Sequence, residues 1–184
     1  MTRSVRPALI GSILIGIVAA GCQGTPVASP SPSLAASTAT PTSAPTPSKT
    51  YGPNATAALT VVQAYYDWIN THSKDPANAN FVALNRIADG EALSSGVSTV
   101  NLMVRAGQHQ VGDVVLAQMI PDSDSPTLIA VTVCVDTSKA TVLNKDGQPV
   151  RRSDGLTRVA AFPKVENRGG SWFVISARGG NTSC

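Results

Sequence analysis

Charged and aromatic side chains are scarce in this sequence. Of its 184 residues, 14% are charged and 4% are aromatic, and histidine occurs only twice. Fourteen Lys and Arg against eleven Asp and Glu give a net charge of +3, and so weak a balance argues against nucleic acid as a partner. The length allows one ordinary domain and hardly two.

Motifs for catalysis and cofactor binding are also missing. The chain has no phosphate-binding loop, no Gly-x-Ser-x-Gly elbow, no His-Glu-x-x-His motif and no dinucleotide-binding glycine pattern in the right context. His72 and His109 fall in predicted loops, and no Cys/His pair has the spacing of a zinc site. Asp122 and Asp124 lack the glycine and distal glutamate of a calcium loop. We therefore expect neither a metal ion nor a cofactor.

Residues 1–21 have the pattern of an export signal. Arg3 and Arg6 precede an apolar run over residues 8–20, which is shorter than the roughly 20 residues that a membrane-spanning helix needs. The run ends in small residues directly before Cys22. The alternative is a plain secretory signal that is cleaved near Ala20, with Cys22 incidental.

The stretch Ala19-Ala20-Gly21-Cys22 resembles the lipobox of bacterial lipoproteins. The resemblance implies that the chain is cut before Cys22 and that this cysteine receives diacylglyceryl and acyl groups. Two or more acyl chains anchor a protein stably to a membrane, whereas one gives only marginal binding. We therefore expect a lipid-anchored protein on the outer, extracytoplasmic face of the cell membrane.

Residues 22–53 are predicted to be the lipidated cysteine and a disordered tether. Of the 28 residues from 23 to 50, 23 are Pro, Ser, Thr or Ala, and Lys49 is the single charge. The segment has no apolar periodicity, so burial of apolar side chains cannot offset the entropy that is lost when it becomes ordered. A spacer between membrane and domain is the simplest interpretation, and a proline-rich partner-binding motif is the alternative.

Residues 54–184 are predicted to form one α+β domain, in which about three helices pack on a curved antiparallel sheet of four to six strands. Asn54 is the expected N-cap of a first helix that ends near residues 70–73. A second helix is expected after Pro76, with Phe81, Leu84 and Ile87 on its apolar face. A third helix would bury four residues at helical spacing: Leu93, Val97, Val100 and Val104.

After Gly107 the apolar period changes from about 3.6 to 2, which indicates strands. We expect strands over 111–120, 127–136 and 139–143, and a final hairpin of 156–165 with 171–177. The turn 144–147 separates the third strand from this hairpin. In the strand 127–136, alternation places Ile129, Val131, Val133 and Val135 on one face.

The predicted order of three helices followed by antiparallel strands resembles the NTF2-like fold. Two aromatic runs add to the resemblance: Tyr65-Tyr66-Asp67-Trp68 in the first helix and Trp172-Phe173 in a late strand. With the lipobox and the tether, the chain is similar to the NTF2-like lipoproteins of actinobacteria. The resemblance implies a cone that can open as a pocket, with Tyr65, Tyr66 and Trp68 facing it. It implies a binding or scaffolding module at the cell envelope, whose partner is a small apolar ligand or an envelope protein.

The same fold also includes enzymes of the ketosteroid-isomerase and polyketide-cyclase kinds. Those members use a pocket carboxylate as a base and a tyrosine as an oxyanion donor. Tyr66 and Asp67 are the residues that this alternative would use here. The predicted central strands carry Val, Ile, Ala, Thr and Cys where a buried acid would stand, so we favour core packing for the tyrosines and an exposed Asp67.

Two cysteines remain once Cys22 carries lipid. Because the extracytoplasmic compartment permits disulfides, we expect a bridge between Cys134 and Cys184, which would pin the C-terminal tail to the sheet. The alternative is two free thiols, with Cys134 in the core and Cys184 in a frayed end. A catalytic cysteine is not expected, because neither histidine lies near Cys134 or Cys184 in the sequence.

Overall fold

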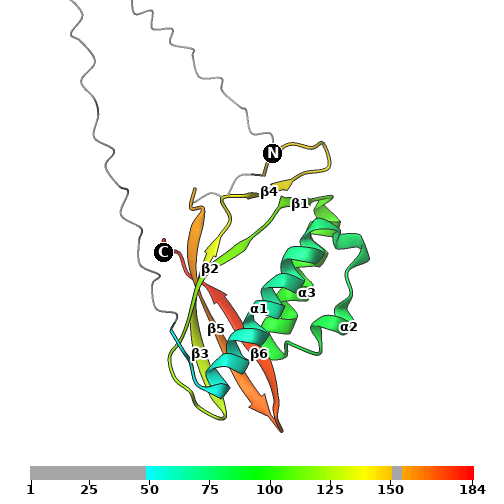
Figure 1. Ribbon diagram of the computed structural model, residues 1–184. Coiled ribbons are helices and arrows are strands. Elements are labelled where there is room, and N and C mark those ends of the chain that lie inside the picture. The colour runs from blue at the N-terminus through cyan, green and yellow to red at the C-terminus, as the bar shows by residue number, and fades with distance from the viewer. Residues whose placement is uncertain (1–48, 151–154) are drawn as a thin grey trace, which may run out of the picture. The chain divides into compact units, whose positions relative to one another are not determined.

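The structure, a computed structural model, describes residues 49–150 and 155–184 (Figure 1). The predicted export signal, Cys22 and the tether up to residue 48 lie outside these residues, so the expectations for them stay predictions. The helices come first: α1 (Pro53–Lys74), the short 3-10 helix η1 (Pro76–Asn78), α2 (Phe81–Leu84) and α3 (Gly90–Ala106). The strands follow: β1 (His109–Gly112), β2 (Val115–Pro121), β3 (Leu128–Asp136), β4 (Ala140–Leu143), β5 (Arg158–Arg168) and β6 (Ser171–Gly179).

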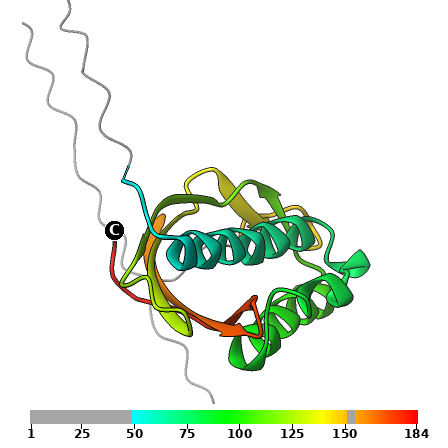
Figure 2. The same ribbon diagram turned by 60° about the horizontal axis from the view of Figure 1, so that its bottom comes forward.

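The strands form a four-stranded antiparallel sheet in the order β2-β3-β5-β6 and a two-stranded sheet of β1 and β4. Figure 2 shows the larger sheet curving around α1, with α3 packed near β6. The predicted fold class is confirmed: helices at the N-terminus pack on a curved antiparallel sheet. This is the architecture that the resemblance to the NTF2-like fold implies.

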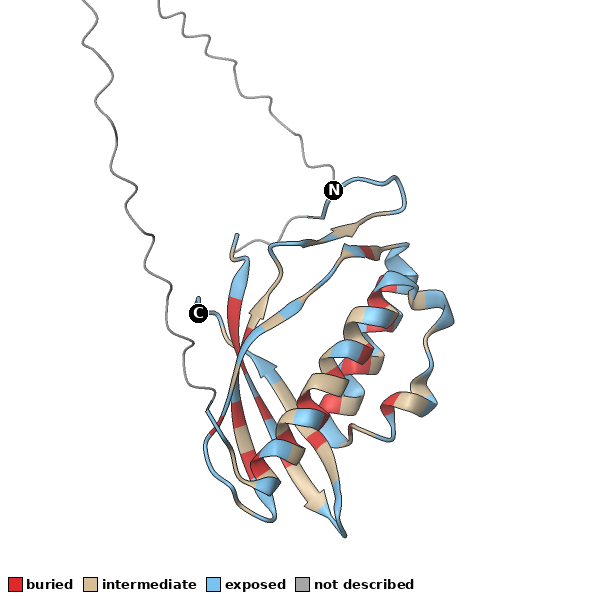
Figure 3. Cartoon of the chain, viewed as in Figure 1, coloured by how far each residue is buried: buried red, intermediate tan, exposed pale blue. Residues whose placement is uncertain are grey.

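The core lies between the concave face of the sheet and the helices (Figure 3). Ile129, Val131 and Val133 of β3 are fully buried there, as their alternation predicts. Val62 of α1 and Leu84 of α2 cover them from the helical side. Within the described part of the chain, no helix is both long and apolar enough to cross a membrane.

The prediction that Asn54 caps α1 is wrong. The N-cap is Gly52, and Pro53 occupies the first helical position, where its missing N–H costs nothing. The free N–H of Ala55 instead donates to the Asp124 carboxylate at 2.6 Å, and Asn54 Nδ2 donates to the Asp124 carbonyl at 3.2 Å. The cap thus comes from the loop between β2 and β3, so no local sequence pattern could reveal it.

The helical region after α1 also departs from its prediction in detail. The second helix consists of η1 and the single turn α2, and Ile87 lies beyond both. In α3, Val100 is buried as expected, but Val104 is 46% exposed and Met103 is buried in its place. Asp89 caps α3 by accepting from Gly90 N, so α3 begins at Gly90.

The predicted strand 111–120 is two strands, because the chain leaves the sheet at residues 113 and 114. Gly112 has φ +80°, and a Cβ there would lie 1.9 Å from the Lys139 carbonyl oxygen, so only glycine fits this close approach. Asn70 of α1 fixes the break by donating to Asp113 Oδ1 at 3.0 Å and accepting from Val114 N at 3.1 Å. β4 therefore pairs with β1 and not with the main sheet.

Candidate functional site

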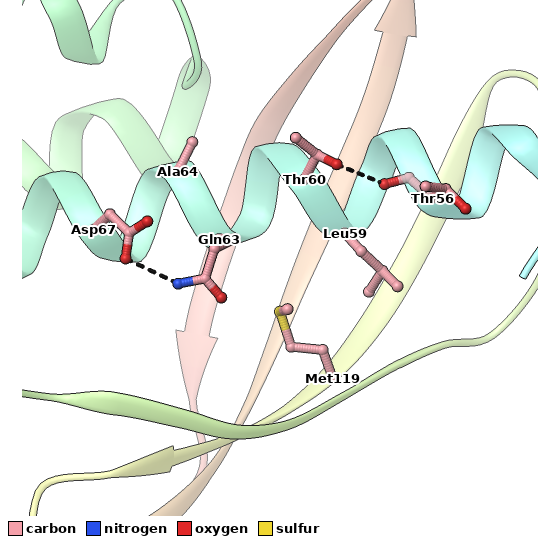
Figure 4. A pocket seen from close by; sticks show the side chains of 7 residues that line it. All are labelled: Thr56, Leu59, Thr60, Gln63, Ala64, Asp67 and Met119. Carbon is pink, nitrogen blue, oxygen red and sulfur yellow. Dashed lines mark hydrogen bonds between the residues drawn. The ribbon is translucent and has the colours of Figure 1, made fainter. Parts of the chain in front are cut away.

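A mostly apolar groove of about 480 Å³ opens between α1 and β2 (Figure 4). Six residues of α1 and one of β2 line it: Thr56, Leu59, Thr60, Gln63, Ala64, Asp67 and Met119. A groove with an apolar floor and a few polar side chains has the composition of ligand sites in proteins. It is therefore the candidate binding site within the described residues.

Helical spacing and a strand irregularity bring these residues together. Thr56, Thr60 and Ala64 follow one another at intervals of four residues, so these small side chains form one row along α1. In β2 the register with β3 shifts between Leu116 and Gln118. Beyond this bulge Met119 stands opposite Val133, which is fully buried, so Met119 points inward to the groove.

Polar groups on the groove are partly engaged with one another. Thr60 Oγ1 donates to the Thr56 carbonyl at 2.9 Å, and Gln63 Nε2 donates to Asp67 Oδ1 at 2.8 Å (Figure 4). Asp67 is exposed and is the only charged residue among those that line the groove. The groove thus presents an aliphatic floor of Leu59 and Met119 and one carboxylate on its rim.

Tyr65 and Trp68 lie in the core and do not line this groove. Tyr65 is buried, and its hydroxyl donates to the Ala92 carbonyl of α3 at 3.1 Å. Burial raises the pKa of Tyr65 to about 12. Trp68 Nε1 donates to the Asn80 carbonyl at 2.9 Å, and its ring packs against Phe81. Their predicted place in a pocket stays a prediction.

Tyr66 and Asp67 are neighbours in sequence, but they face different surroundings. Tyr66 packs against the core, where burial and the adjacent Tyr65 raise the pKa of its phenol. Asp67 stays at the surface and accepts from Gln63. No hydrogen bond joins Tyr66 to another described residue, so the acid and tyrosine of an isomerase-like site are not brought together at these two positions.

Cys134 and Cys184 form a disulfide with a Cα–Cα distance of 5.7 Å, as predicted. The tail that it holds also pairs with β5, because Ala160 N donates to the Thr182 carbonyl at 3.0 Å and Gly180 N donates to the Ala160 carbonyl at 2.7 Å. The disulfide therefore fixes the C-terminal segment against the sheet and is part of the scaffold.

Buried acids are lacking in the part of the chain that the structure describes. No Asp or Glu side chain there is buried, and the two buried polar side chains are Ser73 and Gln110. Within residues 49–150 and 155–184, no three His, Cys, Asp or Glu side chains cluster as a metal site would require. The carboxylates in this part of the chain are thus all at least partly exposed to solvent.

Comparison with known proteins finds likeness in structure alone. No protein-family model and no curated protein matches the sequence. The intermembrane-space region of the chloroplast protein ARC6 is similar with a TM-score of 0.49 and 14% identity, over 71% of this chain and 98% of that one. A protein with a cystatin-like fold from Caulobacter vibrioides has a TM-score of 0.43 and 16% identity, over 70% and 89%.

A third similar structure is the Kfla4162 protein from Kribbella flavida, with a TM-score of 0.43 and 10% identity, over 68% of this chain and 88% of that one. All three likenesses are distant, and none carries chemistry from those proteins to this chain. The site must therefore be argued from its own residues.

The groove was not predicted from the sequence, although one signal pointed to it. Thr56, Thr60 and Ala64 recur every four residues in the expected first helix, so they share a face on which the side chains are small. Met119 could not be assigned, because a regular alternation over 111–120 does not allow for the bulge before Gln118. The groove can therefore be identified only from the tertiary fold.

Proposed function

We propose that this protein is a lipid-anchored binding module on the outer face of the cell membrane, and that the groove between α1 and β2 is its binding site. The observation that carries the binding role is the apolar floor of Leu59 and Met119 beneath a rim with a single carboxylate. The anchor rests on the sequence pattern that ends at Cys22.

A binding role fits the chemistry of the domain better than catalysis does. A pocket base would need a carboxylate shielded from water and held near an oxyanion donor. Among the described residues every acid is at least partly exposed, and Asp67 is engaged with Gln63. A ligand with apolar surface gains free energy from the aliphatic floor without any reactive group.

Substitution in the floor tests the site. Nile red, a neutral apolar dye, is titrated into the chain released from the membrane by Cys22→Ser, and its fluorescence is followed. Leu59→Asp places a charge on the floor and should weaken dye binding at least tenfold, while Leu102→Asp should leave it unchanged. Leu102 is a matched control because it is 58% exposed on α3. Equal affinities in all three proteins would contradict the proposed site.

Membrane retention tests the anchor separately. We expect the natural chain to sediment with membranes and the Cys22→Ser chain to appear in the soluble fraction, since the acyl groups supply the membrane affinity. An immunoblot of the two fractions measures this. A Cys22→Ser chain that stays in the membrane fraction would rule out anchoring through Cys22.

A further inference from the structure

At the β2 edge of the main sheet, next to the groove, no further strand pairs among the described residues. In the sheet order β2-β3-β5-β6, β2 is an edge strand, and β3 is its only partner among the described residues. Edge strands expose unpaired N–H and C=O groups that can template another strand. The groove reaches this edge strand at one residue, since Met119 of β2 is one of its lining residues.

The main-chain groups of Met119 face this free edge. Asp122 N donates to the Ala130 carbonyl at 2.9 Å, which marks that pair as hydrogen-bonded. Bonded and non-bonded pairs alternate along an antiparallel ladder. In this register Ile120 is therefore bonded to β3, and Met119 directs its N–H and carbonyl away from β3.

β2 has two of the features that protect an edge from pairing, a bulge and a proline, but it has no charged side chain. Its seven residues carry no charge, and Val115 and Ile120 are exposed. Natural edge strands are usually blunted by charged side chains, prolines or bulges. The bulge precedes Gln118 and Pro121 is the last residue, so the regular stretch is limited to Gln118–Ile120. Within this stretch, Met119 is the residue whose N–H and C=O both face the free edge.

Small side chains of α1 line the groove together with Met119 of β2. The row of Thr56, Thr60 and Ala64 brings small side chains to the place where an added strand would cross α1. The main sheet curves around α1 in Figure 2, so a strand added at β2 would continue this curve over the row.

Charge further defines the partner. Asp67 is the only charged residue among those that line the groove, and its side chain is exposed. A Lys or Arg on the added segment would complement it, whereas an acidic residue would be repelled. The remaining surface is aliphatic or hydroxyl-bearing and favours uncharged side chains.

We propose that the groove and the free edge of β2 take up an extended polypeptide segment of another protein by strand addition, with a basic side chain of that segment at Asp67. This rests on the proposed function of the groove and names its ligand class. The main-chain groups of Met119 supply the pairing, and Leu59 and Met119 receive one apolar side chain of the segment.

Random eight-residue peptides displayed on phage are selected against the full chain carrying Cys22→Ser, and the enriched peptides are synthesised. We expect enriched peptides with a Lys or Arg that bind below 1 mM in fluorescence anisotropy. They should slow amide hydrogen exchange in residues 115–121 and leave the exchange of residues 171–179 unchanged. Methylation of alternate peptide amides should reduce affinity about tenfold, since it removes pairing but keeps the side chains.

Asp67→Asn should weaken the same peptides several-fold, while Asp146→Asn, at an exposed turn away from the lining residues, should not. The proposal fails if no peptide binds below 1 mM, if methylated peptides bind equally well, or if exchange slows elsewhere. Slow exchange of residues 115–121 without peptide would contradict the proposal, because another segment would then occupy the edge. That segment is the chain's own residues 23–48 if their deletion makes the exchange fast. It is a second copy of the chain if the protection increases with protein concentration. If Leu59→Asp abolishes dye binding but no peptide binds, the groove remains a binding site and only the proposal of a peptide ligand fails.

Discussion

Two neighbouring tyrosines of α1 use their hydroxyl groups differently. Tyr65 is buried and donates to the Ala92 carbonyl of α3, whereas Tyr66 has no hydrogen-bond partner among the described residues. A buried hydrogen bond contributes about 1 kcal/mol to stability, and phenylalanine at position 65 would lack the hydroxyl that makes this one.

We therefore predict that Tyr65→Phe lowers the free energy of unfolding by about 1–2 kcal/mol in urea titrations. Tyr66→Phe is the matched control, since it removes the same atom without breaking a described hydrogen bond, and its effect should stay within about 0.5 kcal/mol. A larger loss for Tyr66→Phe than for Tyr65→Phe would contradict the packing of α1 described above.

Glu91 links the start of α3 to the edge of the sheet. It accepts from Arg178 Nε at 3.0 Å and from Ser176 Oγ at 3.1 Å. The hydrogen bond from Arg178 is the largest cause that holds the pKa of Glu91 below its usual 4.5, and that from Ser176 adds to it. Because the folded pKa is lowered, the stability from this contact is fully present above about pH 4.5 and is lost as the pH falls through the folded pKa.

Thermal unfolding between pH 7 and pH 2 tests whether the contact between Glu91 and Arg178 stabilises the domain. The melting temperature of Arg178→Met should lie below that of the natural chain at pH 7 and approach it as the pH falls from 4.5 towards 2, since protonated Glu91 no longer gains from the arginine. Arg86→Met is a control with an exposed arginine and no described ion pair. An offset for Arg178→Met that stays constant at all pH values would show that Glu91 is not its cause.

Among the helices, α1 depends on a cap from a distant loop. The Asp124 carboxylate accepts from Ala55 N at 2.6 Å and places a negative charge at the positive end of the helix dipole. Asp124→Ala should therefore destabilise the domain by about 1 kcal/mol in urea unfolding. Asp146→Ala, which removes an exposed acid from a turn, should cost less than about 0.5 kcal/mol.

The helices and strands show which structural features a sequence pattern can predict. Period-two alternation placed Ile129, Val131 and Val133 correctly, because both the pattern and the burial come from the same pleated strand. The hydrogen bond by which Asp124 caps α1 and the break after Gly112 could not be predicted, because each depends on a residue far away in the chain. The groove escaped for the same reason, since it joins a helix to a bulged strand 50 or more residues later.

At the level of the domain, the disulfide closes the chain between Cys134 and the C-terminal residue over a sequence separation of 50. In the chain-entropy model such a loop contributes about 4 kcal/mol by restricting the unfolded chain. The double variant Cys134→Ala, Cys184→Ala should unfold at a correspondingly lower urea concentration, and exchange at Ala160 and Gly180 should become faster. Unchanged exchange at these amides would mean that the tail stays on β5 without the bridge.

Selective ¹³C-methyl labelling of methionine tests the binding site most directly. Met119 lies on the groove floor, and Met103 is buried in α3 and serves as an internal reference in the same spectrum. Nile red is titrated into the labelled Cys22→Ser chain while the methyl resonances are recorded. If the groove is the binding site, the Met119 methyl resonance should shift saturably and the Met103 resonance should not change. Saturable dye binding that leaves Met119 unmoved would contradict it.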